Sequence, residues 1–405
     1  MTEPRRLSVT CCIAGGGPAG MVLGFLLARA GIEVAVLEKH ADFFRDFRGD
    51  TIHPSTLEVM HELGLLEEFL KRPHDEAQEL SGSVGDWQTT VADMRHLPTH
   101  CKFVAIMPQW DFLDFIAEAG RRYPGFRTLM RTDAVDLVEA EGRVTGVRAE
   151  TPEGPLEISA DLVVGADGRH STLRPKGGFA VEEFGAPIDV LWLRLSRRPS
   201  DRGQAFGRFD RGGLLVQIGR QGYWQCGFVI AKGSLEARKA KGLDAFRAEI
   251  ARFAPGLADR THEIKSWDDV KLLTVTVDRV RQSHKPGLLL IGDAAHAMSP
   301  IGGVGVNLAV QDAVAAANIL AGPLSARTLT DADLAAVQRR REFPTRMTQR
   351  LQLFIQDRFL ARVIAGGPVE PPFALRLARR FPVLRRIPAR VIGMGFRPEH
   401  VAPAA

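Results

Sequence analysis

The sequence predicts a mixed α/β fold with three parts: an open parallel sheet flanked by helices, an inserted antiparallel sheet, and a helical C-terminal segment. Three observations support this. A strand, a glycine-rich turn, a helix and a second strand follow one another within residues 7–38. Residues 188–232 contain short apolar and aromatic runs separated by turn signals, as in antiparallel strands. Beyond residue 323 the apolar residues recur with helical spacing and arginines lie between them.

The composition is that of an ordinary globular protein, with 405 residues, 45% hydrophobic and 25% charged. No basic stretch followed by an apolar run marks a secretory signal, and the longest apolar runs are too short to span a bilayer. The four cysteines lack the spacing of metal ligands, and two of them lie in the first predicted strand. We therefore expect a cytoplasmic protein with reduced cysteines and no metal site.

The net charge of +5 is unevenly distributed. Residues 339–405 hold fourteen arginines, no lysine and four acids, so the preceding residues carry a net negative charge. The basic character belongs to the C-terminal segment, and we expect no nucleic-acid partner for the body of the protein.

The glycine-rich turn follows the predicted strand Leu7–Ile13 and has the spacing G-x-G-x-x-G. Gly15 permits a tight turn, Gly17 lets the backbone approach a pyrophosphate, and Gly20 lets the helix pack closely on the strand. Glu38, at the end of the second strand, can accept hydrogen bonds from both ribose hydroxyls of an adenosine. This pattern predicts a Rossmann-type dinucleotide site rather than a plain glycine-rich turn. It does not distinguish FAD from NAD.

The next segment predicts a loop and then a helix that begins at Ser55, with Glu58 placed as in a capping box. The loop carries Arg48 and Pro54 and would lie at the carboxyl end of the sheet, where ligands bind. A later helix opens near Gln109, which is either a cofactor contact or simply an exposed helix start.

A β-meander is predicted over residues 135–158, and a further apolar strand then ends at Asp167 and Gly168. An Asp-Gly pair after a strand is ordinarily only a turn. Together with the first motif, it predicts a second wall of the cofactor cleft.

The antiparallel strands predicted between residues 188 and 232 are followed by a helix over residues 239–253. One face of this sheet could line a substrate pocket, although packed core is the more common role for any single side chain of such a stripe. The candidate substrate residues are Trp192, Arg194, Trp224 and Phe228.

Residues 287–313 carry the other strong signal. A buried strand ends at Gly292 and Asp293, and a loop with Pro300 and three glycines then enters a long helix of small residues. The glycines let the backbone approach a planar ligand, and the helix N-terminus suits a flavin ring that becomes negative on reduction. His296 has the chemistry of a base beside this loop, but a packed, hydrogen-bonded histidine is the more common case.

The C-terminal segment predicts a long helix near residues 331–364 and a second helical piece over residues 373–391, broken by Pro382 and Pro388. The second piece could lie on an anionic membrane surface. We favour the interpretation that this piece docks on the body of the protein and that its arginines are solvated.

These three motifs, in this order and spacing, resemble the flavin-dependent aromatic hydroxylases. These are single-component, FAD-containing class A monooxygenases of the para-hydroxybenzoate hydroxylase type, and they include ubiquinone-biosynthesis and polyketide-tailoring enzymes. The resemblance covers roughly residues 7–322. We expect an FAD-binding domain from residues 1–76, 101–176 and 268–322, a substrate-binding sheet domain from 77–100 and 177–267, and a C-terminal segment from 323–405.

The resemblance also implies roles for single residues. The implied cofactor-binding residues are Gly15, Gly17, Ala19, Gly20, Glu38, Arg48, Gln109, Asp167, Gly292, Asp293, Pro300, Gly303, Gly305, Val306 and Asn307. Arg48 and Pro300 would lie next to the reaction, Arg48 touching both FAD and the nicotinamide donor, and no general base is assigned. Val304 stands where many members have a polar residue, so no side-chain contact to the flavin is expected there.

The implied reaction uses NADPH or NADH as a transient donor, which fits the lack of a second nucleotide fingerprint. Hydride passes to flavin N5, O2 is captured as a C4a-hydroperoxide, and a hydroxyl is transferred to a phenolic, quinone-like or polycyclic aromatic ring. Two other hypotheses remain open. One is a flavin reductase or dehydrogenase acting on a prenyl or polyketide intermediate, and the other is a non-catalytic flavin-fold binding protein. The substrate, the donor and the oligomeric state, monomer or homodimer, are left open by the sequence.

Overall fold

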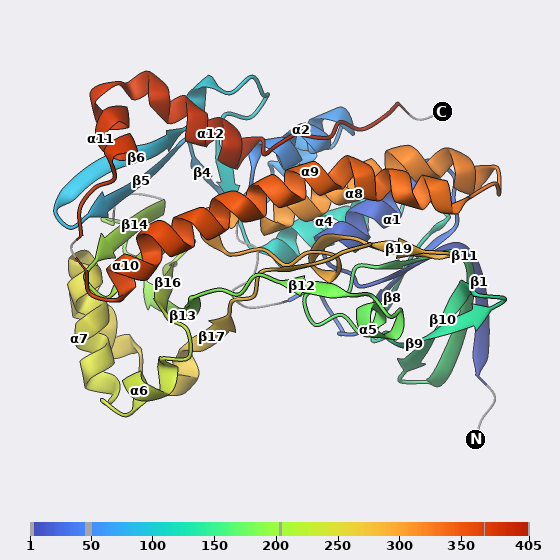
Figure 1. Cartoon of the computed structure of the whole chain (residues 1–405), viewed down its shortest axis with the longest axis horizontal. Helices are drawn as coiled ribbons and strands as arrows, with labels where there is room; N and C mark the ends of the chain where they lie inside the picture. The colour runs from blue at the N-terminus through green and yellow to red at the C-terminus, as the bar shows by residue number, and fades with distance from the viewer. Residues whose placement is uncertain (1–3, 45–50, 202–204, 368, 404–405) are drawn as a thin grey trace.

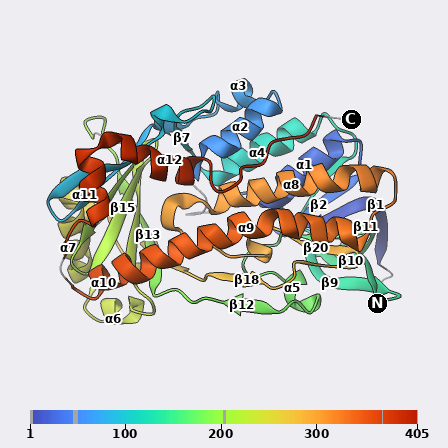
Figure 2. The same ribbon diagram turned by 45° about the horizontal axis from the view of Figure 1, so that its top comes forward.

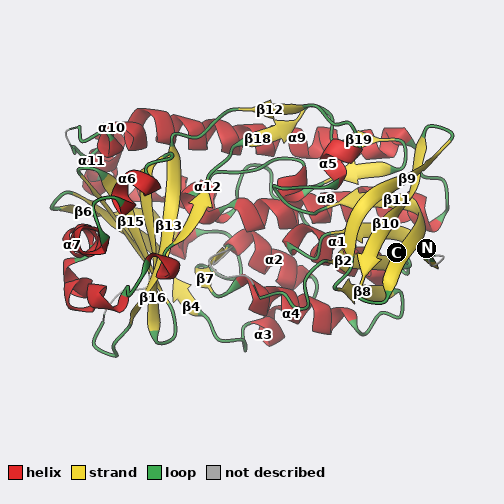
Figure 3. Ribbon diagram, turned by 90° about the horizontal axis from the view of Figure 1, so that it is seen from below, coloured by secondary structure: helices red, strands yellow, loops and turns green. Residues whose placement is uncertain are grey.

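The computed structural model describes residues 4–44, 51–201, 205–367 and 369–403 (Figure 1). It confirms the mixed α/β fold. Two sheets lie at opposite ends of the molecule, as the view from below shows (Figure 3). The long helix α9 (Asp331–Ile355) runs from one part to the other, beside α8 (Gly305–Ser325) (Figure 2).

The first sheet is mainly parallel and has the strand order β20-β11-β1-β2-β8. Its strands are β1 (Arg5–Ala14), β2 (Val34–Glu38), β8 (Phe126–Met130), β11 (Gly154–Gly165) and β20 (Leu288–Leu290), and β19 (His284–Lys285) pairs antiparallel with β20. The apolar strands β2 and β20 are buried along their whole length. Because parallel strands end at the same edge, the loops after β1, β2, β11 and β20 meet there.

One face of this sheet is covered by a β-meander, as predicted. The strands β9 (Asp133–Ala140) and β10 (Arg143–Thr151) pair antiparallel with each other, and β10 pairs with the first half of β11. The meander, the short helix α5 (Leu173–Lys176) and the sheet enclose one apolar cluster. Beyond the part that pairs with β10, β11 continues as a parallel strand of the sheet and leads into the loop that carries Asp167.

Helices cover the other face of the parallel sheet. They are α1 (Pro18–Arg29), α2 (Pro54–Glu62), α3 (Leu66–Phe69), α4 (Gln109–Gly120) and α8. The stretch Ile301–Ser325 is long and apolar enough to cross a bilayer, but it packs against α1 and α9, and 61% of its most apolar window is buried. Its apolar character is that of a core helix. The helix expected to begin at Ser55 begins at Pro54, with His53 as N-cap, because proline suits the first helical turn.

The second sheet has seven strands in the order β17-β13-β16-β15-β14-β5-β6. Its strands are β5 (Glu79–Val84), β6 (Trp87–Asp93), β13 (Ile188–Ser196), β14 (Ala205–Asp210), β15 (Gly213–Gly219), β16 (Tyr223–Ala231) and β17 (Lys271–Thr274). Because β17 pairs with β13, the second part extends past the boundary expected at residue 268. The helices α6 (Leu235–Lys239) and α7 (Leu243–Phe253) replace the single helix expected over 239–253, since Gly242 separates them at a φ of +89°.

Short strands connect the two parts. The strands β3 (Thr51–Ile52), β7 (Val104–Ile106) and β4 (Asp75–Ala77) form a small antiparallel sheet, and β12 (Val181–Glu183) pairs with β18 (Asp278–Val280).

The C-terminal segment packs on both parts. After α9 come a π-helical turn over Gln356–Leu360, then α10 (Ala361–Ile364), α11 (Phe373–Arg380) and α12 (Arg386–Gly393). The helix α12 contacts β6 of the second sheet, so the segment docks on the body. Pro388 does not break the helix as expected, because it lies in the first turn of α12, where proline is tolerated.

Candidate cofactor site

The carboxyl edge of the parallel sheet brings together most of the residues expected to bind a dinucleotide. The turn after β1, the end of β2, the Asp167 loop after β11 and the segment between β20 and α8 all meet at this edge. Gln109 is the first residue of α4, which packs beside α1. Arg48 lies outside the described residues, so its place in the site stays a prediction.

The turn after β1 has the shape that a pyrophosphate requires. Gly15 has a φ of +112°, and a Cβ there would lie 2.3 Å from the carbonyl oxygen of Ala166. A Cβ at Gly20 would lie 2.0 Å from the carbonyl oxygen of Gly15, so α1 is packed directly against the turn. A Cβ at Gly17 would meet nothing within 4 Å, and no side chain caps the helix that begins there. Ala19 follows in the first turn of α1. The free N–H groups and positive end of α1 therefore face open space, which fits bound phosphate.

Glu38 ends β2 beside this turn. It is buried, with 9% of its surface exposed, and its Oε1 accepts a hydrogen bond of 2.9 Å from the N–H of His40. A Cβ added to Gly16 would lie 2.9 Å from the Cβ of Glu38, so only glycine lets the turn and the carboxylate come this close. This position suits a carboxylate that binds the ribose of an adenosine.

Asp167 has one carboxylate oxygen in use and one without a partner among the described residues. Its Oδ2 accepts hydrogen bonds from the N–H groups of Thr172, at 2.7 Å, and Leu173, at 3.1 Å. Its Oδ1 is buried and accepts none. A buried acceptor without a donor is costly, so this oxygen fits a ligand that brings a hydroxyl or N–H group.

Asp293 follows β20 and lies opposite Arg169, whose Nη2 is 3.4 Å from its Oδ2. The N–H of the preceding Gly292 donates a hydrogen bond of 3.1 Å to Oδ2 of Asp312, on α8. Asp312 thereby holds the Gly292-Asp293 turn from behind. Because its side chain is partly exposed, Asp293 is suited to accept hydrogen bonds from the hydroxyls of a ribityl chain.

The loop from Pro300 to Gly305 presents backbone rather than side chains. Gly302 and Gly303 have φ angles of +80° and +64°, and a Cβ at Gly303 would lie 2.6 Å from Oγ1 of Thr51. A Cβ at Gly305, the first residue of α8, would meet nothing within 4 Å. The loop and the uncapped N-terminus of α8 fit a planar ring whose edge becomes negative.

Asn307 ties this loop to the segment around His53. Its Oδ1 accepts hydrogen bonds from the N–H of His53, at 2.8 Å, and from Oγ1 of Thr56, at 2.7 Å. Its Nδ2 donates to the carbonyl oxygens of Thr51, at 3.3 Å, and Gly303, at 3.4 Å. Asn307 therefore positions the loop from within the fold, and a direct contact of Asn307 or of the neighbouring Val306 with the cofactor stays a prediction.

His53 is a buried residue that the sequence did not mark as important. Its Nδ1 lies 2.7 Å from the carbonyl oxygen of Ile392 in α12, and its Nε2 lies 3.3 Å from Oγ1 of Thr51. Burial lowers the pKa of His53 from 6.5 to about 4, against the opposing effect of the Ile392 carbonyl. The neutral imidazole thus connects the C-terminal segment to the loop at the site.

His296 belongs to a buried network of charges behind the site. Its Nε2 lies 2.7 Å from Oδ2 of Asp312, whose Oδ1 accepts a hydrogen bond of 2.8 Å from Nε of Arg341. Nη1 of Arg341 in turn donates to Oε1 of Glu399, at 3.1 Å. Burial alone would lower the pKa of His296, but the Asp312 carboxylate raises it above its usual range. These contacts show that His296 is a buried, hydrogen-bonded histidine, the more common case of the two that the sequence left open.

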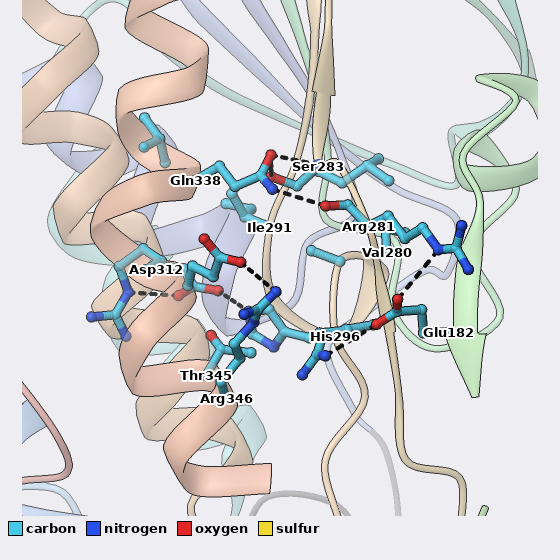
Figure 4. Close-up of a pocket in the computed structure, with 16 residues that line it drawn as sticks. Glu182, Val280, Arg281, Ser283, Ile291, His296, Asp312, Gln338, Thr345 and Arg346 are labelled. Atoms are coloured by element: carbon cyan, nitrogen blue, oxygen red, sulfur yellow. Dashed lines mark hydrogen bonds and ion pairs between the residues drawn. The ribbon is translucent and has the colours of Figure 1, made fainter. Parts of the chain in front are cut away.

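His296, Asp312 and Arg341 of this network line a cavity of about 310 Å3 between β20 and α9 (Figure 4). In Figure 4, Asp312 and Thr345 lie beside the helices on the left, and Glu182 and Arg281 lie on the opposite side. The sequence patterns did not identify Asp312, Arg341 or Glu399. Asp312 is a lone acid within an apolar helix of small residues, and this is the signal by which it could have been found.

The candidate substrate residues divide between the two faces of the second sheet. Trp224 and Phe228 lie on the face covered by α7, with 4% and 0% of their surfaces exposed, and pack in its core. Both therefore occupy core positions, which is the more common role for such side chains, and a contact of either with substrate stays a prediction. Trp192 and Arg194 lie on the opposite face, because side chains alternate along β13. Arg194 stacks on the ring of Tyr223 there, 4.9 Å from its centroid.

Trp192 lies on the face of the second sheet that α7 does not cover. Its ring lies over Gly227, where a Cβ would come within 3.0 Å of it. Trp192, Val216 and Ile301, the residue after Pro300, each pack against one buried apolar cluster. This cluster thus forms an apolar wall that both Trp192 of the second sheet and Ile301 of the loop adjoin.

Comparison with known proteins agrees with this geometry. Residues 8–351 match the family described as FAD binding domain. The chain is 33% identical over 382 residues to 6-methylpretetramide 4-monooxygenase of Streptomyces rimosus, covering 94% of this chain and 91% of that protein. It is 28% identical to rifampicin monooxygenase of Streptomyces venezuelae, covering 74% of this chain and 61% of that protein.

Among solved structures, p-nitrophenol 4-monooxygenase PnpA of Pseudomonas putida superposes with a TM-score of 0.73 at 19% identity, over 96% of each chain. That similarity shows the shared fold. The family match and the relative that is 33% identical show that this chain belongs to the FAD-binding-domain family and, within it, to the single-component FAD-dependent aromatic hydroxylases.

Proposed function

We propose that this protein hydroxylates a polycyclic phenolic compound bound between the Pro300 loop and the Trp192 face of the second sheet. One observation supports this placement above the others. Trp192 and Ile301 pack against the same buried apolar cluster, although they come from the second sheet and from the cofactor loop. A flat, largely apolar ring system fits such a wall. The tetracyclic substrate class is supported by the relative that is 33% identical, whose printed name is 6-methylpretetramide 4-monooxygenase.

Bound FAD would supply the redox chemistry, accepting hydride from NADPH or NADH and activating O2 for transfer of one oxygen atom. The chain supplies binding, orientation and exclusion of water. The end of α1 at Gly17 binds the pyrophosphate, Glu38 the adenosine ribose, and Asp293 the ribityl hydroxyls. The N-terminus of α8 stabilises negative charge on the ring edge. The apolar wall around Trp192 keeps water from the reacting atoms and positions the substrate ring.

The partners of this reaction are the aromatic substrate, the nicotinamide donor and O2. Arg48 is proposed to contact FAD and the donor, and Pro300 to lie beside the reacting ring. A cytoplasmic location is supported by the four cysteines, all buried and free. Monomer and homodimer are both compatible with this function.

The test is anaerobic stopped-flow reduction of the FAD-loaded protein by NADPH and by NADH, with and without a panel of one-ring to four-ring phenols. We expect one class of multi-ring phenol to accelerate reduction. On addition of 18O2, one labelled atom should appear in the product. Turnover that yields a product without added oxygen would instead support a dehydrogenase and contradict the proposal.

A matched pair of variants tests the substrate wall. We expect Trp192→Ala to raise the KM for the aromatic substrate. More O2 should also be reduced to hydrogen peroxide for each molecule of product formed, because the substrate ring is held less firmly. Trp267→Ala is the control, since Trp267 packs on the other side of the sheet, against Phe246 of α7. Equal effects of the two substitutions would remove Trp192 from the substrate wall.

A further inference from the structure

The helices α11 and α12 expose an unusual mixture of side chains at the edge of the second sheet. In Figure 1 they lie above β5 and β6. Large apolar side chains point to solvent here, with Phe373 71% and Ile387 63% exposed. The exposed apolar side chains are Phe373, Leu377, Phe381, Val383 and Ile387, and the arginines beside them are Arg376, Arg379, Arg380, Arg385, Arg386 and Arg390. We call this set the α11–α12 face.

The helical spacing arranges these residues as an amphipathic surface. Phe373 and Leu377 are one turn apart on the outer side of α11, with Arg376 and Arg380 along one flank. Ala378, on the opposite side, is buried against the body. The apolar side chains therefore remain outside even though each helix already has a buried side, so docking on the body does not account for them.

The charge of the face is also uncompensated. Residues 371–398 contain seven arginines and no acid. No ion pair joins any of these arginines to an acid within the described residues, whereas some arginines elsewhere on the surface are paired, as in Arg247 with Asp244 and Arg346 with Glu342. Arg379 and Arg380 instead lie over the rings of Trp87 and Phe381. A partner with negative charge and an apolar interior would satisfy both features.

We propose that the α11–α12 face binds the surface of an anionic phospholipid bilayer. Helices of eight residues are far too short to span a membrane but can lie in its interface, with apolar side chains among the acyl chains and arginines at the phosphates. A second copy of the chain does not fit this face. A two-fold contact would bring two sets of arginines together without any acid from the same segment.

Lipid binding here would act on an element that also supports the site. The inner side of α12 carries the Ile392 carbonyl that contacts His53, and Ala389 packs in one cluster with Ile218 and Trp192. An apolar substrate that partitions into the bilayer would thus be concentrated beside the substrate wall. This last connection rests on the proposed function, whereas lipid binding by the face does not.

The test is flotation of the full-length, FAD-loaded protein with vesicles of phosphatidylcholine alone or with about one third phosphatidylglycerol. We expect binding to the anionic vesicles that weakens at high salt. Two triple variants follow: Phe373→Ser/Phe381→Ser/Ile387→Ser, and Arg376→Gln/Arg380→Gln/Arg386→Gln. Each arginine near an anionic surface contributes roughly a fivefold gain in partitioning, so the arginine variant should bind about 100-fold less.

Matched controls are available on other surfaces. Phe354→Ser removes an apolar side chain that is 63% exposed on α9. The triple variant Arg121→Gln/Lys241→Gln/Lys271→Gln removes three exposed positive charges away from the α11–α12 face, and so matches the loss of net charge in the arginine variant. We expect both controls to bind vesicles like the wild type, and all variants to retain FAD.

Absence of wild-type binding to anionic vesicles, or equal binding by the α11–α12 variants and the controls, would overturn the proposal. The proposal would also be overturned if the wild-type protein did not bind vesicles but formed a dimer in sedimentation velocity, and if the α11–α12 variants lost that dimer. Failure of hydroxylation alone would leave the lipid result intact, so the two proposals are tested separately.

Discussion

Replacing His53 with asparagine should remove a specific part of the acid sensitivity of the folded protein. In the folded state burial lowers the pKa of His53 from 6.5 to about 4. An unfolded chain takes up a proton at this residue as soon as the pH falls below about 6.5. The unfolded state therefore binds more protons between pH 6.5 and pH 4, and stability is full above this window and falls within it.

The size of the effect follows from the same two values. Each pH unit across the window weakens the folded state by about 1.4 kcal/mol, which gives about 2 kcal/mol by pH 5 and about 3 kcal/mol by pH 4. Asparagine does not titrate, and its Nδ2 can donate to the Ile392 carbonyl as the imidazole does over 2.7 Å. His53→Asn therefore keeps the contact and should lack this pH-dependent loss.

The assay is urea unfolding of the FAD-loaded wild type and variant at pH 7.5 and pH 5, followed by far-ultraviolet circular dichroism. We expect the wild type to lose about 2 kcal/mol more than His53→Asn between these two pH values. His262→Asn is the control, since His262 is exposed and should leave the wild-type loss unchanged. The same loss in wild type and His53→Asn would refute the reasoning.

Three further substitutions test the site. Asp293→Ala should abolish FAD retention, measured as flavin absorbance per protein after gel filtration, because it removes the carboxylate assigned to the ribityl chain; full occupancy would contradict this. Arg48→Ala should keep FAD but slow its reduction by NAD(P)H in stopped flow, and unchanged kinetics would exclude Arg48 from that role. Asn307→Leu should cost about 2–4 kcal/mol in urea unfolding, because the N–H of His53 and the Thr56 hydroxyl lose their buried acceptor. Asn318→Ala, on the exposed side of α8, is the control and should lower the free energy of unfolding by less than about 1 kcal/mol. Equal losses in the two variants would contradict the role of Asn307 as a buried hydrogen-bond acceptor.

The local units of the fold could be predicted from the sequence because their parts are neighbours along the chain. The strand, turn and helix around Gly15 to Gly20 form from the 25 consecutive residues 5–29, and the turn at Gly292 from fewer. Their meeting at one sheet edge follows from the parallel arrangement of the strands. The main features of the cofactor site could therefore be predicted from local sequence patterns.

Contacts between distant residues could not be predicted in this way. His53 and Asn307 are 254 positions apart, and nothing in either local sequence indicates the other. The alternation along β16 predicts two faces for the second sheet but does not indicate which one α7 covers, so the buried position of Trp224 under α7 could not be predicted. The exact helix starts depend on single residues, as Pro54 shows.

The network that ends at Glu399 has a consequence for how the protein folds. Glu399 is buried, and its carboxylate accepts hydrogen bonds from Arg340 and from Arg341, which lies 58 positions earlier in the chain. A buried carboxylate is stable only when it is paired, so the segment around Glu399 can pack into the body only once α9 is in place. The wall behind the cofactor site thus depends on residues far apart in the chain, and firm binding of FAD should require both α9 and the segment around Glu399 to be packed.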